Sequence, residues 1–268
     1  MSQSVRTCRE NHHCATTRGP GHGAAAERWQ YRRSMQRPSA EEAARRFLAE
    51  RFPDAIAAFL GGSVIAGGAT PTSDLDIMAV TTREDAPFRE SFVQHGWQIE
   101  AFVHTATSYR EYFDRDVKRR RPSLPMLCAK GLILADVDGN AELIRSEAIA
   151  LIESGPEAPS EAELADMRYR VTDLLDDFLG CQTQAEAVWA AIDLAQDAAD
   201  LALIANRRWL GRSKWRDRAL SAYDPALARS LALALEATIC RGERTELVAW
   251  VDLQLRQVGG RLFEGYRR

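Results

Sequence analysis

The chain has 268 residues, 46% hydrophobic and 27% charged, which suits a soluble protein of one large domain or two small ones. Its formal net charge of −3 disfavours a nucleic-acid partner, and it has neither an apolar run of membrane-spanning length nor an apolar signal core. The five cysteines are irregularly spaced and form no CxxC pair, which fits reduced thiols, so we expect a cytoplasmic protein without a membrane partner.

Residues 1–36 are polar and show no hydrophobic periodicity, which predicts a disordered N-terminal tail. Cys8, His12, His13 and Cys14 have zinc-binding side chains, but no second ligand pair with standard spacing follows them. Met35 is a plausible alternative start of the chain.

Alternating strand and helix patterns follow the tail. Ser39 and Glu42 form a capping box, which predicts a helix that ends before Pro53. Short apolar runs predict strands at 55–60, 75–80, 98–104 and 131–136. Helical patterns lie near 88–95, 109–118 and 141–153. We therefore expect a mixed α/β sheet domain over residues 37–155.

Helical patterns fill the rest of the chain. Gly155, Pro156 and Pro159 mark a linker, and capping boxes begin helices at Ser160 and Thr183. The second of these helices is expected to continue to Trp209. Two further helices are predicted, one after Asp224-Pro225 and one containing Leu247, Trp250, Val251 and Val258. Residues 156–268 thus predict an all-α bundle packed beside the sheet.

The stretch 59–80, FLGGSVIAGGATPTSDLDIMAV, concentrates residues suited to phosphate and metal chemistry. Gly62 and Ser63 follow a strand and leave backbone N–H groups and a hydroxyl open to a phosphate. Asp74 and Asp76 are one residue apart on a strand, so both carboxylates point to one face, where a hard divalent cation would offset their repulsion. Glu100 lies on the next strand among apolar residues.

This pattern resembles the DNA polymerase beta-like nucleotidyltransferases: Gly-Ser, about ten residues, Ser-Asp-x-Asp, then an acid on a later strand. Gly67-Gly68, Pro71 and the run 73–76 look most like the streptomycin/spectinomycin-type aminoglycoside adenylyltransferases. The resemblance covers residues 55–136; beyond them only the layout is similar, with a helical domain that closes over nucleotide and drug.

The resemblance implies a role for each matching residue. Asp74 and Asp76 would hold two Mg²⁺ ions that bridge the phosphates of ATP, and Glu100 would take the proton of the attacking hydroxyl or contact metal. Gly62, Ser63 and Ser73 would bind the nucleotide. The acceptor hydroxyl would attack the α-phosphorus in line, and pyrophosphate would leave.

Candidate ligand contacts in the helical half have alternative explanations. Arg207 and Lys214 flank Trp209 as the family's phosphate-binding arginine and lysine do, although the interval is shorter here; a basic helix C-terminus is the alternative. Asp197 and Trp189 would bind the acceptor, with Asp197 in an acidic stripe completed by Glu186, Asp193 and Asp200. A solvated helix face explains the stripe equally well. The basic run 118–121 is typical of an exposed helix end.

The sequence thus predicts an enzyme that transfers AMP or another nucleoside monophosphate to a small hydroxylated acceptor, most specifically an aminoglycoside. One alternative is a protein-modifying or antitoxin-like nucleotidyltransferase, although small antitoxin forms typically lack a long helical domain. Another is a non-catalytic nucleotide-binding module, against which the intact acids argue. The acceptor, the base preference and the oligomeric state are left open by the sequence.

Overall fold

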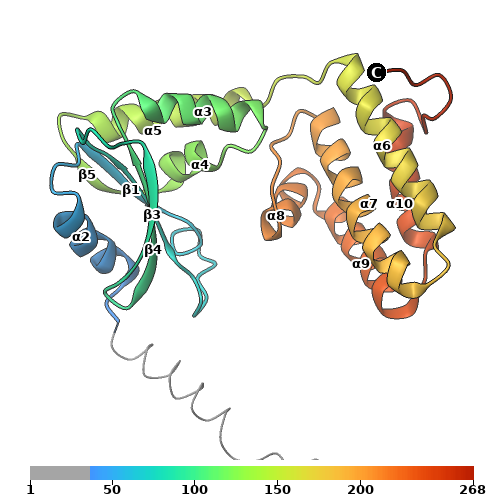
Figure 1. Cartoon of the computed structure of the whole chain (residues 1–268), viewed down its shortest axis with the longest axis horizontal. Coiled ribbons are helices and arrows are strands. Elements are labelled where there is room, and N and C mark those ends of the chain that lie inside the picture. Colours follow the sequence, from blue (N-terminus) through green and yellow to red (C-terminus); the bar gives the residue numbers. More distant parts are fainter. Residues whose placement is uncertain (1–36) are drawn as a thin grey trace, which may run out of the picture.

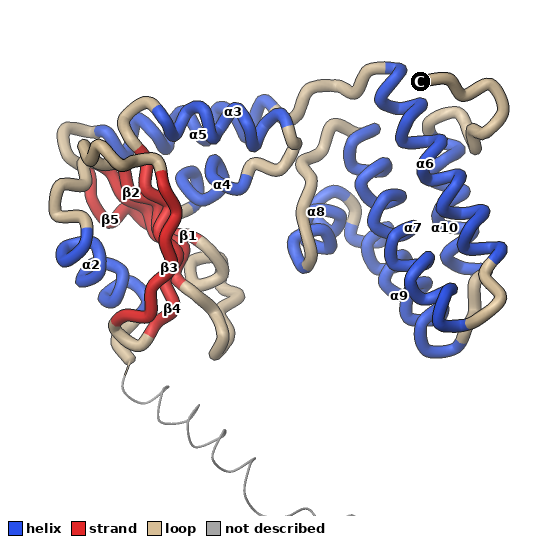
Figure 2. Tube along the Cα trace, viewed as in Figure 1, coloured by secondary structure: helices blue, strands red, loops and turns tan. Residues whose placement is uncertain are grey.

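The computed structural model describes residues 37–268 as a sheet domain followed by a helical region (Figure 1). The tail, the Cys8–Cys14 cluster and Met35 lie outside the described residues. The first part contains, in order, α2 (Ala40–Arg51), β1 (Ala57–Gly61), β2 (Leu75–Val80), β3 (Phe88–Gln94), β4 (Trp97–His104), α3 (Ser108–Lys118), α4 (Ser123–Lys130), β5 (Leu132–Asp136) and α5 (Asn140–Ser154). Helices alone follow: α6 (Glu161–Gly180), α7 (Gln184–Ala205), α8 (Lys214–Tyr223), α9 (Pro225–Arg241) and α10 (Thr245–Gln257) (Figure 2).

The sheet has the strand order β3-β4-β2-β1-β5 and is mixed. β2 and β4 run parallel, while the other neighbouring pairs are antiparallel. The predicted fold class, a small mixed sheet domain followed by an all-α region, is confirmed. The parallel pair is the important one for the site, because it places Asp76 directly beside Glu100.

Helices cover both faces of the sheet because alternate residues of the central strands are apolar on both sides. Phe59 and Met78 pack under α3, α4 and α5 on one face. Leu60 and Ile77 pack against α2 on the other face (Figure 1). The even-numbered residues of β2 therefore lie on the α3–α5 side, and Asp76 is one of them.

The helical region has a separate core around α7, whose many alanines allow close helix packing. Its predicted helix starts are confirmed. The Ser160 and Thr183 hydroxyls accept from Glu163 N and Glu186 N, and Asp224 accepts from the N–H groups of Ala226 and Leu227.

Two sequence expectations about elements were wrong. The segment 88–95 is strand β3 with the start of a turn, not a helix. Phe88 and Phe92, four residues apart, fit one face of a helix and one face of a strand equally. Pairing with β4 makes the segment a strand. The two strands are joined by a two-residue turn in which His95 and Gly96 both have positive φ.

The second misjudged element is the end of α7, which stops at Ala205 instead of Trp209. Arg207 has a φ of 52°, and the chain turns there so that Trp209 Nε1 donates to Ile152 O at 3.1 Å.

Helices α4 and α8 were not predicted. α4 is short, with Pro125 in its first turn, where a missing N–H costs nothing.

The helical region is joined to the sheet domain by hydrogen bonds as well as by the linker. Leu210 N donates to Arg120 O at 2.7 Å, and Trp209 Nε1 donates to Ile152 O at 3.1 Å. The expected division of the chain at residue 155 stays a prediction. Within residues 37–268, no helix is both long enough and apolar enough to span a bilayer.

Phe47 tests the core between α2 and the sheet. It is fully buried, and its ring makes edge contacts with Phe92 and Phe52, with centroids 5.0 and 5.9 Å apart. Phe47→Ala should lower the free energy of unfolding by about 3–5 kcal/mol, because the side chain leaves a cavity. Urea unfolding checks this, with Leu233→Ala, at an exposed position of α9, as the control. Similar losses in the two variants would contradict the assignment of Phe47 to the core.

Candidate metal centre

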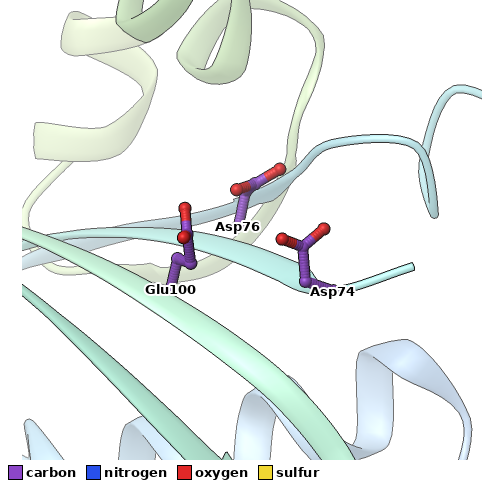
Figure 3. Close-up of side chains that lie close together, drawn as sticks. All are labelled: Asp74, Asp76 and Glu100. Carbon is purple, nitrogen blue, oxygen red and sulfur yellow. The ribbon is translucent and has the colours of Figure 1, made fainter. Parts of the chain in front are cut away.

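Three carboxylates converge on one side of the sheet (Figure 3). One oxygen from each of Asp74, Asp76 and Glu100 lies within 4.8 Å of the others. Asp76 and Glu100 are neighbours in the register of β2 and β4, and Asp74 precedes β2 by one residue. We call these three residues the acidic triad. The predicted convergence of a DxD pair with an acid on another strand is what the structure contains.

A glycine makes room for the triad. Gly61, the last residue of β1, pairs with Asp76, and Gly62 follows it with a φ of 79°. A side chain at position 62 would collide with Oδ2 of Asp76. Position 62 therefore requires glycine both for its backbone conformation and for the close approach of the carboxylate.

Electrostatic repulsion within the triad shows in Asp76. The pKa of Asp76 is raised to about 6: burial is the largest cause, the charges of Asp74 and Glu100 add to it, and Arg89 and Lys214 oppose it. Ionising Asp76 thus costs more free energy in the folded protein than in the unfolded chain. A bound cation would remove that penalty.

Arg89 is a member of the site that the sequence did not reveal. Its guanidinium donates to Oε1 of Glu100 at 2.6 Å and lies over the ring of Phe102, 5.1 Å from the centroid. Sequence reasoning placed Arg89 on a helix. Once the segment is known to be a strand, alternation and pairing with β4 bring Arg89 to the side of Glu100.

The two predicted phosphate-contacting serines lie together. Ser63 Oγ and Ser73 Oγ are 2.9 Å apart, and Thr70 N donates to Ser73 Oγ at 2.8 Å. The loop between β1 and β2 is closed by backbone hydrogen bonds from Gly68 N to Ser63 O and from Ala66 N to Gly62 O. The hydroxyls of Ser63 and Ser73 therefore lie at the base of the loop between β1 and β2, beside the triad. We call this loop, residues 62–74, the glycine loop.

The four residues of the helical half that were predicted to bind nucleotide or acceptor lie in different surroundings. Lys214 begins α8, and its charge is close enough to lower the pKa of Asp76. Arg207 lies against the linker through Pro156 O. Asp197 is paired with Arg170 at 2.6 Å, and Trp189 exposes 72% of its surface. Of these four residues, Lys214 is the one whose charge reaches the triad through Asp76.

The donor set fits a hard divalent cation. Carboxylate oxygens are the ligands that Mg²⁺ prefers, and three of them are close enough to share one ion or two adjacent ions. The raised pKa of Asp76 points the same way, because a divalent charge would favour its ionised form. Soft or nitrogen-preferring metals have no suitable ligand in the triad.

Comparison with known proteins gives little further information. The sequence matches no family model and no curated protein. Among solved structures, the chain is similar to a nucleotidyltransferase-like protein from Exiguobacterium sibiricum, with 10% identity, 81% of this chain and 73% of that chain covered, and a TM-score of 0.45. A likeness this distant assigns neither an activity nor a ligand to the chain.

Gly62→Ala should displace the Asp76 carboxylate and weaken Mg²⁺ binding roughly tenfold or more, a loss comparable with that of removing a supporting residue of a metal site. Gly67→Ala is a matched control, since Gly67 also has a positive φ but nothing lies within 4 Å of the added methyl. Calorimetric Mg²⁺ titration compares the two variants. Equal losses would mean that backbone strain, rather than the collision with Asp76, causes the effect.

Asp76→Asn should stabilise the metal-free protein at neutral pH. Because the folded state binds the proton of Asp76 more tightly than the unfolded chain, the free energy of unfolding falls as pH rises from about 4 to about 6 and stays low above that range. The variant should therefore gain about 1–2 kcal/mol at pH 8, with partial solvent screening limiting the effect, and little at pH 4.

Urea unfolding at pH 4 and pH 8, in the presence of a chelator, measures this gain. Asp114→Asn, at an exposed position of α3, controls for the substitution itself. Added Mg²⁺ should then stabilise the wild type but not Asp76→Asn. A loss of stability in Asp76→Asn at pH 8 would show that the carboxylate is not under the strain described.

Proposed function

We propose that the protein is a metal-dependent nucleotidyltransferase of the polymerase beta-like type. It would transfer AMP, or another nucleoside monophosphate, from a nucleoside triphosphate to a hydroxyl of a small acceptor. The observation that carries the proposal is the acidic triad: carboxylates on the paired strands β2 and β4, beside a loop whose Gly62 makes room for one of them.

In this proposal Asp74 and Asp76 would hold Mg²⁺, which would neutralise charge on the triphosphate. The hydroxyls of Ser63 and Ser73, with the backbone N–H groups of the glycine loop, contact phosphate oxygens. Lys214 contributes a cation from the first residue of α8, and Arg207 would do so from the turn after α7. The positive charge near Asp76 supports the role of Lys214.

At phosphorus the reaction forms one bond and breaks one bond. The acceptor oxygen bonds to the α-phosphorus while the bond from that phosphorus to the bridging oxygen breaks, and its electron pair leaves with pyrophosphate. Glu100 takes the hydroxyl proton. Arg89 engages Oε1 of Glu100, which leaves Oε2 to accept that proton.

The surroundings of Asp197 bear on the chemistry of the acceptor. The sequence resemblance favours an aminoglycoside, with Asp197 and Trp189 as contacts. An incoming polycation would have to replace Arg170, which now pairs with Asp197. Glu186 is engaged as well, because its carboxylate accepts from the N–H groups of Gln182 and Thr183. An acceptor panel should therefore include neutral and anionic hydroxyl compounds.

The test is transfer of label from α-labelled nucleoside triphosphates in the presence of Mg²⁺. Each triphosphate would be supplied alone and with an acceptor panel that includes streptomycin, spectinomycin and kanamycin, and pyrophosphate release would be followed. Activity should fall at least about a thousandfold in Asp76→Asn. Asp114→Asn should keep it.

Each result has a distinct meaning. Transfer to a small molecule that is lost in Asp76→Asn supports both the activity and the acceptor class. Labelling of proteins in an extract, with no small-molecule product, favours a protein side chain as the acceptor. Mg²⁺-dependent nucleotide binding with no transfer at all favours a non-catalytic module. Absence of nucleotide binding would overturn the proposal.

A further inference from the structure

A buried carboxylate joins three separate parts of the chain. Asp200, on α7, exposes only 8% of its surface. Its Oδ1 accepts from Arg216 Nε at 3.0 Å, and its Oδ2 accepts from Arg121 at 3.2 Å. Arg121 belongs to the sheet domain, between α3 and α4, and Arg216 belongs to α8. We call Arg121, Asp200 and Arg216 the Asp200 bridge.

The sheet-domain end of the bridge is itself firmly held. Arg121 N donates to Asp116 O at 2.9 Å, and the buried Asp116 carboxylate accepts from Leu124 N at 2.9 Å and from Arg119 at 2.7 Å. The neighbouring Arg120 donates to both carboxylate oxygens of Glu163 on α6. Arg120 and Arg121 of the basic run therefore attach the helical region, whereas Lys118 and Arg119 are exposed, as expected of a helix end.

The α8 end of the bridge is next to Lys214. Arg216 follows Lys214 by two residues and also donates to Gln196 at 3.1 Å. The turn before α8 is tight, since a side chain at Gly211 would collide with the carbonyl of Trp215. Once Arg216 is fixed, little freedom remains in the position of Lys214.

Lys214 in turn faces the catalytic side. Figure 1 shows α8 on the side of the helical region that is turned toward the sheet domain. Arg218, one helical turn after Lys214, reaches the glycine loop: its guanidinium would lie 3.2 Å from a methyl group at Gly68. The charge of Lys214 lowers the pKa of Asp76. The same helix is thus tied to Asp200 on one side and faces the triad on the other.

We propose that Asp200 is a positioning residue, which fixes α8 against the sheet domain so that Lys214 is held in place for the triphosphate. This inference rests on the proposed function. A lysine side chain is flexible, so binding a ligand costs it conformational entropy. Fixing its backbone beforehand reduces that cost and so strengthens ligand binding. Asp200 suits this task because it is buried and binds two guanidinium groups in fixed directions.

Arg121→Gln is the sharpest variant, because it removes the contact of Asp200 with the sheet domain and leaves the Asp200–Arg216 pair in place. Arg121 is also partly exposed, with 40% of its side chain accessible, so the fold should tolerate the change. We expect Mg²⁺-dependent ATP binding to weaken roughly tenfold, in the range usual for coupling between sites. Mg²⁺ binding without nucleotide should stay unchanged, because no triad residue is altered.

A double-mutant cycle with Lys214→Ala tests the route of the effect. If Asp200 acts through Lys214, the loss caused by Lys214→Ala should be much smaller in the Arg121→Gln background than in the wild type. Asp252→Asn is the matched control, since Asp252 pairs with Arg261 through both carboxylate oxygens at 2.9 Å, within the helical region. It should leave ATP affinity unchanged and give an additive cycle with Lys214→Ala.

Hydrogen exchange gives a readout that does not depend on ATP. Arg121→Gln should speed exchange of the amides of residues 206–223 in the ligand-free protein, whereas Asp252→Asn should not. ATP binding that is intact in Arg121→Gln, or additive with Lys214→Ala, would overturn the proposal. Faster exchange in α8 with no ATP binding by the wild type would instead overturn the proposed function, and leave the bridge as a structural link only.

Discussion

Three carboxylates held within 4.8 Å of one another are the constraint on which the sheet domain depends. Their repulsion opposes folding, and the register of β2 and β4 keeps Asp76 and Glu100 neighbours in spite of it. Gly62 has no side chain because the Asp76 carboxylate occupies that space. Burial, together with the charges of Asp74 and Glu100, raises the pKa of Asp76, and a divalent cation would offset both effects. Local strain of this kind is characteristic of functional sites.

The positive charges that oppose this repulsion come from two different parts of the fold. Arg89 acts from the edge strand β3, beside Glu100, and Lys214 acts from the first residue of α8. The helical region therefore takes part in the electrostatics of the site although it contributes no carboxylate to the triad. Its attachment through Asp200 and the backbone of Arg120 makes that contribution depend on how the two parts are joined.

The sequence predicted what is encoded locally. Helix starts were recognisable from Ser39, Ser160, Thr183 and Asp224, since an N-cap works through neighbours two or three residues away. The convergence of the triad followed from alternation along β2 and from the fold that the motif resembles. β3 was misjudged because its aromatic spacing fits either periodicity, and Arg89 was missed with it. The turn after α7 was missed because Arg207 takes a left-handed conformation that side chains rarely adopt.

Charge patterns were the hardest part of the sequence to interpret, and the structure shows why. The basic run before Pro122 and the acidic stripe of α7 were judged separately, one as an exposed helix end and the other as either a stripe suited to a cationic ligand or a solvated helix face. Arg121 and Asp200, which are 79 positions apart, form an ion pair, and Asp197 forms one with Arg170. Counting charges along one helix cannot reveal such pairing, because the partner lies on another element. Two of the four acids of the stripe, Asp197 and Asp200, are therefore neutralised by arginines of the protein itself, which lowers the attraction that the stripe as a whole would exert on a cation.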